Sequence, residues 1–215
     1  MLREWLGVIG MDAKKIQRSA LCSVVPAVQS AFSESLEKIS NVAPRIVNAE
    51  SKLNFGFNYP NHTTLGADRI ANLIAARHFF GENLIIADFG TAITFCVLTD
   101  SKFIGGVISP GIASSLEALF AKAAKLPKII FRNNGIAIGK STIQSIEIGA
   151  YLGWKGLIRE TLTEIKSELP ENGARHTVIA TGGISENLDF AQEFFDVVDK
   201  NLTLRGLNLS MLDLF

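Results

Sequence analysis

A carboxylate, a glycine and a hydroxyl follow one another where a strongly apolar stretch of the sequence ends. Residues 84–87 have the pattern of a buried strand, and Asp88, Gly90 and Thr91 come directly after it. Asp88 supplies a carboxylate, Gly90 lets the backbone approach a ligand closely, and Thr91 offers a hydroxyl and an amide. A turn of this kind can wrap around phosphate groups or hold a cation. The same residues also suit an ordinary hairpin turn, so the pattern by itself leaves both interpretations open.

A second pair of charged residues, Asp68 and Arg69, stands before an amphipathic segment that predicts a helix to about residue 80. An aspartate in the first turn of a helix complements the helix dipole and can cap free amides, which is a purely structural explanation. The functional interpretation is that Asp68 lies where a substrate hydroxyl approaches and that Arg69 holds an anion.

Two further candidates lie nearer the C-terminus. Thr142 stands ahead of a long helix predicted over residues 143–169, where a hydroxyl can act simply as the N-cap. The turn Thr181-Gly182-Gly183 follows a predicted strand, and it suits either a phosphorylated ligand or a tight strand-to-helix connection. Gly139-Lys140-Ser141 resembles the tail of a Walker A motif, but Asn134 stands where that motif needs its first glycine.

The elements around these candidates alternate between helices and strands, which indicates a layered α/β arrangement. We expect helices over residues 1–9, 27–39, 67–80, 112–124, 143–169 and 186–195, and strands over 20–25, 44–47, 84–87, 93–98, 103–108 and 177–180. Residues 54–64 are expected to be a loop, and residues 125–131 a connection with some strand character. The glycines of the 143–169 helix, at positions 149, 153 and 156, lie near helical spacing and permit close helix packing.

The amino-acid composition excludes several classes of protein. The chain has 215 residues, 47% of them hydrophobic, so it can bury a substantial core in one large domain or two small ones. Its 21 basic and 21 acidic residues balance, which argues against nucleic acid or an anionic membrane as the main partner. No apolar run predicts a membrane span and no signal-peptide pattern opens the sequence, so we expect a cytoplasmic protein. Cys22 and Cys96 are expected to be reduced thiols, and the histidines lack the spacing of a zinc site.

Short motifs follow one another along nearly the whole chain in a fixed order. The set comprises Ser23-Val24-Val25-Pro26, Tyr59 with Gly66-Ala67-Asp68-Arg69, Asp88-Phe89-Gly90-Thr91-Ala92, Gly105-Gly106 with Pro110-Gly111, Gly139-Lys140-Ser141-Thr142, Thr181-Gly182-Gly183 and the 202–207 ending Leu-Thr-Leu-Arg-Gly-Leu. The ordered set is far more specific than any single motif, and by it the chain resembles the type III pantothenate kinases, a family of the actin-like and hexokinase-like ATPase superfamily. The resemblance implies an α/β fold with two duplicated ribonuclease H-like lobes.

The resemblance also implies a reaction, the ATP-dependent phosphorylation of the terminal hydroxyl of pantothenate on the way to coenzyme A. Asp68 would be the general base, a role that suits phosphoryl transfer because one carboxylate orients the attacking hydroxyl. Tyr59, Gly66, Ala67, Arg69 and Thr142 would contact pantothenate, with Arg69 on its carboxylate, while Thr91 would contact an ATP phosphate and Asp88 a monovalent cation. We assign the glycines at 90, 182 and 183 to the nucleotide because they permit close approach.

By the same resemblance, magnesium accompanies ATP, the monovalent cation is potassium or ammonium, and the protein is a homodimer whose substrate pocket is completed at the subunit interface. Two features depart from the family pattern. Pro60-Asn61-His62 follows Tyr59, so the loop there is expected to differ in shape. The family's opening strand with Asp-x-Gly-Asn, which holds ATP phosphates and magnesium, has no counterpart in the 215 residues. We therefore expect a first lobe over residues 1–83 that is N-terminally incomplete, and a second lobe over residues 84–215.

Two rival functions remain at this stage. Relatives of the family include Bvg accessory factors, so a non-catalytic regulator acting through a protein partner is one alternative. Another enzyme of the superfamily, such as a sugar kinase or a polyphosphate phosphatase, is the second, although Tyr59 with Gly66-Ala67-Asp68-Arg69 favours pantothenate.

Without the Asp-x-Gly-Asn motif, much of the phosphate cradle is missing from these residues, and transition-state charge on the phosphoryl group is then less well stabilised. We therefore expect the 215-residue polypeptide to be a poor or inactive kinase. Steady-state transfer of phosphate from ATP to pantothenate measures this directly. A turnover rate equal to that of family members that carry the motif would contradict the expectation.

Overall fold

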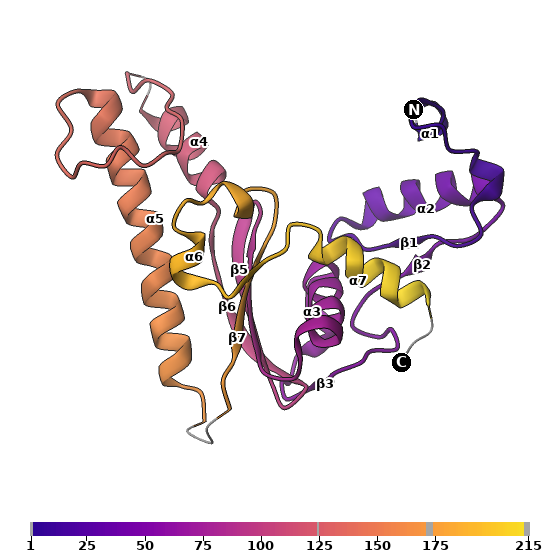
Figure 1. Cartoon of the computed structure of the whole chain (residues 1–215). Helices are drawn as coiled ribbons and strands as arrows, with labels where there is room; N and C mark the ends of the chain where they lie inside the picture. Colours follow the sequence, from indigo (N-terminus) through magenta and orange to yellow (C-terminus); the bar gives the residue numbers. More distant parts are fainter. Residues whose placement is uncertain (1, 124, 171–173, 213–215) are drawn as a thin grey trace. The chain divides into compact units, whose positions relative to one another are not determined.

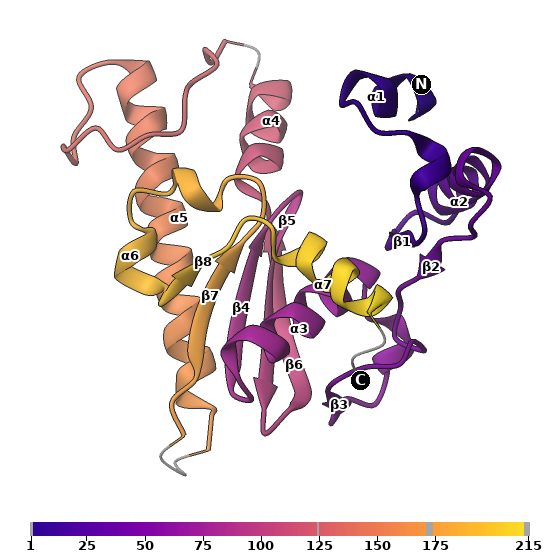
Figure 2. The ribbon, with the colours of Figure 1, turned by 45° about the vertical axis from the view of Figure 1, so that its right-hand side comes forward.

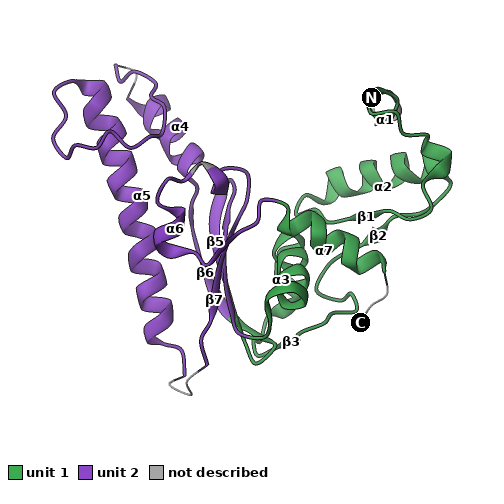
Figure 3. Ribbon diagram, in the orientation of Figure 1, with its two compact units in different colours: residues 1–82, 98–104, 201–215 green, residues 83–97, 105–200 purple. Residues whose placement is uncertain are grey.

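The computed structural model describes residues 2–123, 125–170 and 174–212, and its contacts divide the chain into two compact units (Figure 3). Unit 1 comprises Met1–Glu82, Leu98–Ile104 and Asn201–Phe215, and unit 2 comprises Asn83–Val97 and Gly105–Lys200. The two-lobe boundary at residues 83 and 84 stays a prediction of the sequence. Each unit is described by itself below.

Unit 1 is mainly helical, with short parallel strand pairs (Figure 1). Its helices are α1 (Leu2–Val8), α2 (Pro26–Ser40), α3 (Ala67–Phe80) and α7 (Leu202–Met211), with 3₁₀ turns η1 (Ala13–Lys15) and η2 (His62–Thr64). Strand β1 (Ala20–Leu21) pairs in parallel with β2 (Arg45–Ile46). Strand β3 (Gly56–Phe57) pairs in parallel with the first residues of β6 (Lys102–Pro110).

The core of unit 1 forms where α3 packs against α7. Ile70, Leu73 and Ile74 of α3 are completely buried. The backbones of the two helices approach so closely that a Cβ atom on Gly206 would overlap the carbonyl oxygen of Ala71. Beside this contact the Thr203 hydroxyl donates a 2.7 Å hydrogen bond to Oδ1 of the buried Asn72. These contacts fix the helix whose first turn carries Asp68.

Unit 2 is built on a sheet whose strands have the order β6-β5-β4-β7-β8. The strands are β4 (Leu84–Phe89), β5 (Ala92–Thr99), β6, β7 (Thr177–Thr181) and β8 (Val197–Val198). Asp100 and Ser101 between β5 and β6 have φ angles of 49° and 60°, which suits a two-residue hairpin turn. Strand β7 lies parallel to β4, so that Asp88 and Thr181 end their strands side by side.

Helices α4 (Ile112–Lys122), α5 (Thr142–Ser167) and α6 (Ala191–Phe194) and the 3₁₀ turn η3 (Ser185–Asn187) complete unit 2. The long helix α5 runs beside the sheet (Figures 1 and 2) and buries Ile158 and Leu162. In the part of the chain that the structure describes, no helix is long and apolar enough to cross a membrane. Cys22 and Cys96 form no disulfide there.

The α/β class and most expected elements are confirmed, and four local expectations are wrong. The segment 54–64 contains β3 and η2 instead of being only a loop, because β3 pairs with β6. The helix expected over residues 186–195 is interrupted, because Leu188 and Phe190 alternate into the core. Residues 125–131 contain no strand. The closing residues 202–211, to which the pattern assigned no element, form α7.

In the described structure the small residues of α5 are not used for close packing, since a Cβ on any of Gly149, Gly153 or Gly156 would meet nothing within 4 Å. Close helix packing instead occurs at Gly206 in α7. Replacing Gly206 by alanine adds a methyl group that overlaps the Ala71 backbone, so the helices must separate. We expect the free energy of unfolding to fall by about 1–3 kcal/mol, as overpacking usually does.

Urea denaturation followed by circular dichroism measures this change. Gly153→Ala in α5 is the matched control, because it makes the same substitution inside a helix without a clash. Helix propensity alone predicts that this control is stabilised by up to about 1 kcal/mol. Equal effects of the two substitutions would show that backbone contact at Gly206 does not matter.

Candidate functional site

The first turn of α3 presents the Asp68 carboxylate through an unusual backbone arrangement. Gly66 is the N-cap residue and makes no side-chain cap. A Cβ atom on Gly66 would lie 2.6 Å from Oδ1 of Asp68, so the carboxylate occupies space that any other residue would fill. Oδ1 accepts a 2.8 Å hydrogen bond from the Arg69 amide, the one hydrogen bond described for this carboxylate. The half-buried side chain can therefore accept a further proton or hydrogen bond through Oδ2.

The chain after β1 lies next to this carboxylate. Val24 is 3.5 Å from the position of a Cβ on Gly66, which places the Ser23–Pro26 motif against the start of α3. Burial raises the pKa of the Cys22 thiol, and the nearby Asp68 carboxylate raises this pKa further. Cys22 is therefore a protonated, weakly nucleophilic thiol beside the candidate base.

Tyr59 and Arg69 both contact the ring of Phe103. The Arg69 guanidinium carbon lies 5.6 Å from the Phe103 ring centroid. The Tyr59 ring meets the same ring edge to face with centroids 5.3 Å apart. Unit 1 thus brings together Tyr59, Gly66, Asp68 and Arg69, four of the residues that the sequence predicts for the substrate site. Ala67, the fifth, is buried as the first residue of α3.

In unit 2 the turn between β4 and β5 is braced from behind by the start of α4. The carbonyl oxygen of Thr91 accepts hydrogen bonds from the Gly111 amide at 3.0 Å and from the Ser114 hydroxyl at 2.9 Å. A Cβ on Gly111 would overlap the carbonyl oxygens of Gly90 and Thr91. The Thr91 side chain itself is exposed. The turn is therefore held rigidly while its outer face stays open to a ligand.

The ends of β4 and β7 place a carboxylate and a hydroxyl on register partners, Asp88 and Thr181. Gly182 has a φ angle of 96°, and a Cβ there would lie 2.6 Å from both Oδ1 of Asp88 and the Phe89 amide nitrogen. Thr181 is fully buried, and its hydroxyl has no hydrogen-bond partner in the described structure. Carboxylate and hydroxyl oxygens are the donors that hard cations prefer. Gly183 follows as an exposed residue of the same turn.

The segment before α5 shows which hydroxyl caps the helix. The Ser141 hydroxyl accepts a 3.3 Å hydrogen bond from the Gln144 amide, and the Gln144 side chain accepts a 2.9 Å bond from the Lys140 amide. This reciprocal pair is a capping arrangement. The N-cap explanation of Thr142 is therefore wrong, and its exposed side chain is available for another role.

A buried carboxylate ties the loop ahead of this cap to α5. Glu147 is only 2% exposed, and Oε2 accepts hydrogen bonds from the side chains of Asn134 at 2.9 Å and Arg132 at 3.2 Å. The Asn134 hydrogen bond, followed by the hydrogen bond and charge of Arg132, lowers the pKa of Glu147. The neighbouring Asn133 donates a 3.2 Å hydrogen bond to the Tyr151 hydroxyl. Three consecutive loop residues are thus fixed on one helix face.

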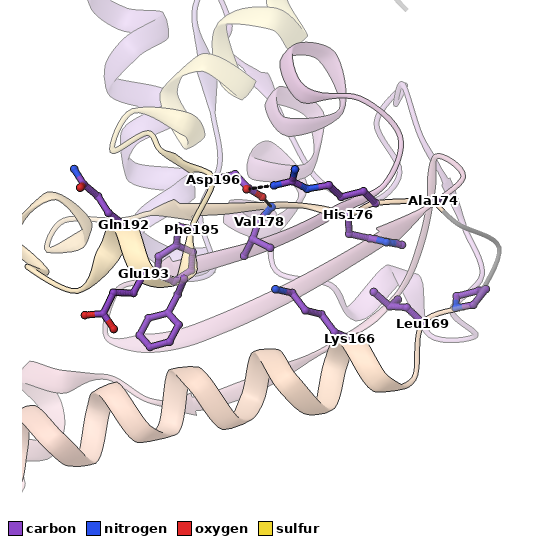
Figure 4. Close-up of a pocket in the computed structure, with 12 residues that line it drawn as sticks. Lys166, Leu169, Ala174, His176, Val178, Gln192, Glu193, Phe195 and Asp196 are labelled. Atoms are coloured by element: carbon purple, nitrogen blue, oxygen red, sulfur yellow. Dashed lines mark hydrogen bonds and ion pairs between the residues drawn. The ribbon is translucent and has the colours of Figure 1, made fainter.

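A separate pocket of about 640 Å³ lies near the end of α5 and the start of β7 (Figure 4). On its wall the Arg175 guanidinium pairs with Asp196 at 2.5 Å, and the Val178 amide donates to the same carboxylate at 2.9 Å. Ligands of open α/β sheets bind at the carboxyl ends of strands. This pocket lies at the amino end of β7, whereas Thr181 and Gly182 lie at the other end of the strand.

Comparisons with known proteins show the family to which the chain belongs. A sequence model of the type III pantothenate kinase family matches residues 2–164. A type III pantothenate kinase from Geobacillus kaustophilus is 38% identical over 212 residues, which are 97% of this chain and 80% of that protein.

Among solved structures, a protein described as a Baf family transcriptional activator from Campylobacter jejuni superposes with a TM-score of 0.61 at 22% identity, over 93% of this chain and 84% of that chain. The ethanolamine utilization protein EutJ from Carboxydothermus hydrogenoformans gives a TM-score of 0.47 at 15% identity, over 85% and 72% of the two chains.

The family model and the Geobacillus kaustophilus relative both define a kinase. Within that class, the chain belongs to the type III pantothenate kinase family.

Several residues that support the candidate site were not identified from the sequence. Ser114 braces the Thr91 turn, and its position three residues after Gly111 in a predicted helix was a usable signal. Thr181 was recognised only as part of a turn motif. Phe103 and Glu147 carry no local signal, because their partners are brought to them by sheet pairing and by a loop.

The Glu147 contacts predict a pH-dependent contribution to stability. Because the folded-state pKa lies below the ordinary value of 4.5, the carboxylate contributes stability that is fully present above about pH 4.5. That contribution is lost as the pH falls through the folded-state pKa. We expect Glu147→Gln to unfold at lower urea concentration than the unchanged protein at pH 7, and the difference to shrink by pH 3.

Urea midpoints at both pH values test this, with Glu160→Gln, at an exposed position of the same helix, as the matched control. The control is expected to change little at either pH. A Glu147→Gln deficit of the same size at pH 3 and pH 7 would contradict the assigned role.

Proposed function

We propose that Asp68 is the general base with which this chain carries out the reaction of its family, the ATP-dependent phosphorylation of pantothenate. The observation that carries the proposal is the Gly66–Asp68 arrangement, in which the absence of a side chain leaves room for a carboxylate with one oxygen available. In phosphoryl transfer such a carboxylate accepts the proton of the attacking hydroxyl and orients its oxygen.

Pantothenate has a carboxylate at one end and the reacting hydroxyl at the other. Arg69 would bind the carboxylate, since a guanidinium recognises a carboxylate through paired hydrogen bonds. The same pocket would be lined by Tyr59, Gly66 and Ala67. Their positions around the start of α3 support this assignment. Thr142 would be a further contact, supported by its exposed side chain, which is not used as the helix cap.

ATP would bind at the carboxyl ends of β4 and β7. Gly90 and Thr91 would contact its phosphates, because the Gly111 and Ser114 hydrogen bonds hold that turn in place. Gly182 and Gly183 would allow the nucleotide to approach the backbone. Magnesium would accompany ATP and neutralise charge on the transferred phosphate.

A monovalent cation, potassium or ammonium, would bind at Asp88. The oxygen set fits: the Asp88 carboxylate lies against Gly182, and its register partner Thr181 has a buried hydroxyl without a partner in the described structure. Such a cation supplies positive charge beside the phosphates when it is bound. Asp88 would hold it, and the Thr181 hydroxyl would complete its oxygen ligands.

The active form would be a homodimer with the substrate site near the interface. Unit 2 exposes several large apolar side chains on the segment before α5 and at its start, which a second subunit can bury: Ile130, Ile136, Ile138 and Ile143. A monomer in sedimentation equilibrium at assay concentrations would contradict this part of the proposal.

The family membership does not favour a regulator without catalytic function, and the sugar-kinase alternative lacks support from the Gly66–Arg69 motif. The cytoplasmic location stays a prediction of the sequence.

Thermal unfolding in the presence of ligands tests the proposed site. A ligand that binds only the folded state at about 100 times its Kd adds roughly 2.7 kcal/mol of stability, which raises Tm by several degrees. We expect pantothenate to raise Tm and glucose or N-acetylglucosamine to leave it unchanged. Potassium is expected to raise Tm above the value in sodium at equal ionic strength, and Asp88→Asn to remove only the potassium effect.

Asp68→Asn separates binding from chemistry. It is expected to keep the pantothenate-induced rise in Tm, since the amide has nearly the same shape, and to lower the residual rate of phosphate transfer by about 10²- to 10⁴-fold relative to the unchanged chain. No shift in Tm with pantothenate in the unchanged chain would contradict the proposed substrate. An Asp68→Asn variant with an unaltered rate would contradict the proposed base.

A further inference from the structure

Phe103 stands at the centre of an aromatic cluster in unit 1. Its side chain is 1% exposed, and its position is fixed by the parallel pairing in which Phe57 of β3 lies in register with Phe103 of β6. The Phe57 and Phe103 rings meet edge to face with centroids 6.4 Å apart, and His62 stacks on Phe57 at 4.6 Å. Rings packed in this way on paired strands hold a fixed orientation.

Two of the residues proposed to contact pantothenate, Arg69 and Tyr59, both contact the Phe103 ring. The Arg69 guanidinium lies over the Phe103 ring at 5.6 Å from its centroid, within the range of a cation–π contact. The exposed Tyr59 contacts the same ring edge to face at 5.3 Å. Tyr59 lies in the segment that follows β3, and Arg69 lies in α3, so Phe103 joins two elements that are separate in the sequence.

We propose that Phe103 is a positioning residue for carboxylate recognition: it holds Arg69 and Tyr59 in the geometry that binds the carboxylate end of pantothenate. This inference rests on the proposed function. An aromatic ring suits the role because it attracts a guanidinium without carrying a negative charge. The contact restrains the Arg69 guanidinium while leaving its positive charge on the side chain.

The experiment compares two ligands that differ only at the acidic end, pantothenate and its alcohol analogue, in which a CH₂OH group replaces the carboxylate. Isothermal titration calorimetry on the full chain gives both Kd values. Phe103→Leu and Phe103→Met remove the ring but keep an apolar side chain of similar bulk. Phe55→Leu is the matched control, because Phe55 is a buried ring of the same cluster that contacts Phe57.

We expect both Phe103 variants to weaken pantothenate binding by roughly threefold to thirtyfold, the range that a cation–π contact supports. Binding of the alcohol analogue is expected to change less than twofold, so the preference for the carboxylate falls. Phe55→Leu is expected to keep the preference of the unchanged protein. Phe103→Tyr, which restores a ring, is expected to recover most of the preference.

If Phe103 only stabilised the fold, the Kd values of the two ligands would change in a different pattern. Equal losses for both ligands, or the same loss of preference in Phe55→Leu, would overturn the inference while leaving the proposed function intact. Melting curves of each variant confirm that the folded protein is being titrated, and Phe103→Met provides the answer if Phe103→Leu unfolds. Failure of the unchanged protein to bind pantothenate would overturn the proposed function, and the inference with it.

Discussion

Helix α3 meets α7 backbone to backbone, and the arrangement of unit 1 depends on this contact. The Ala71 carbonyl occupies the space that a side chain on Gly206 would fill, and the buried Asn72–Thr203 hydrogen bond lies beside it. Because α3 is held along its buried face, its first turn has a fixed position. Gly66 there makes room for the Asp68 carboxylate, and the Phe103 ring supports the next residue, Arg69. The chemistry at one end of α3 therefore relies on packing in its middle.

Unit 2 uses glycines in the same way, because a residue without a side chain lets backbone groups of neighbouring segments come into close contact. Gly111 fits against the carbonyl oxygens of the β4–β5 turn, and Gly182 fits against Asp88 and Phe89. Hydrogen bonds hold two further segments. The Ser114 hydroxyl bonds to the Thr91 carbonyl, and Glu147 anchors the loop ahead of Thr142. Rigid placement matters for a kinase because phosphoryl transfer depends mainly on positioning and on neutralising charge.

Patterns that are local in sequence predicted the fold well. The strands β4, β5 and β6 and the helix after Gly111 are apolar runs bounded by turn residues, and they formed as expected. No element was predicted over α7, and the tight contact with Ala71 that requires Gly206 is visible only in the folded structure. The candidate residues were recognisable as motifs. The residues that hold them in place were not recognisable. Phe103 contacts Tyr59 and Arg69 only because β3 pairs in register with β6, and that pairing joins segments far apart in the sequence.

Unit 1 is assembled from three separated stretches of chain, and its last helix, α7, lies at residues 202–211. During synthesis, the apolar face of α3 that α7 covers must wait until some 120 further residues have been translated and have left the ribosome. Contacts between such distant segments form slowly, and the uncovered surface is prone to misassembly in the meantime. Unit 2, by contrast, has all its residues before position 201. During synthesis on the ribosome, the helix that carries Asp68 is therefore among the last parts of the protein to be packed by its partner helix, α7.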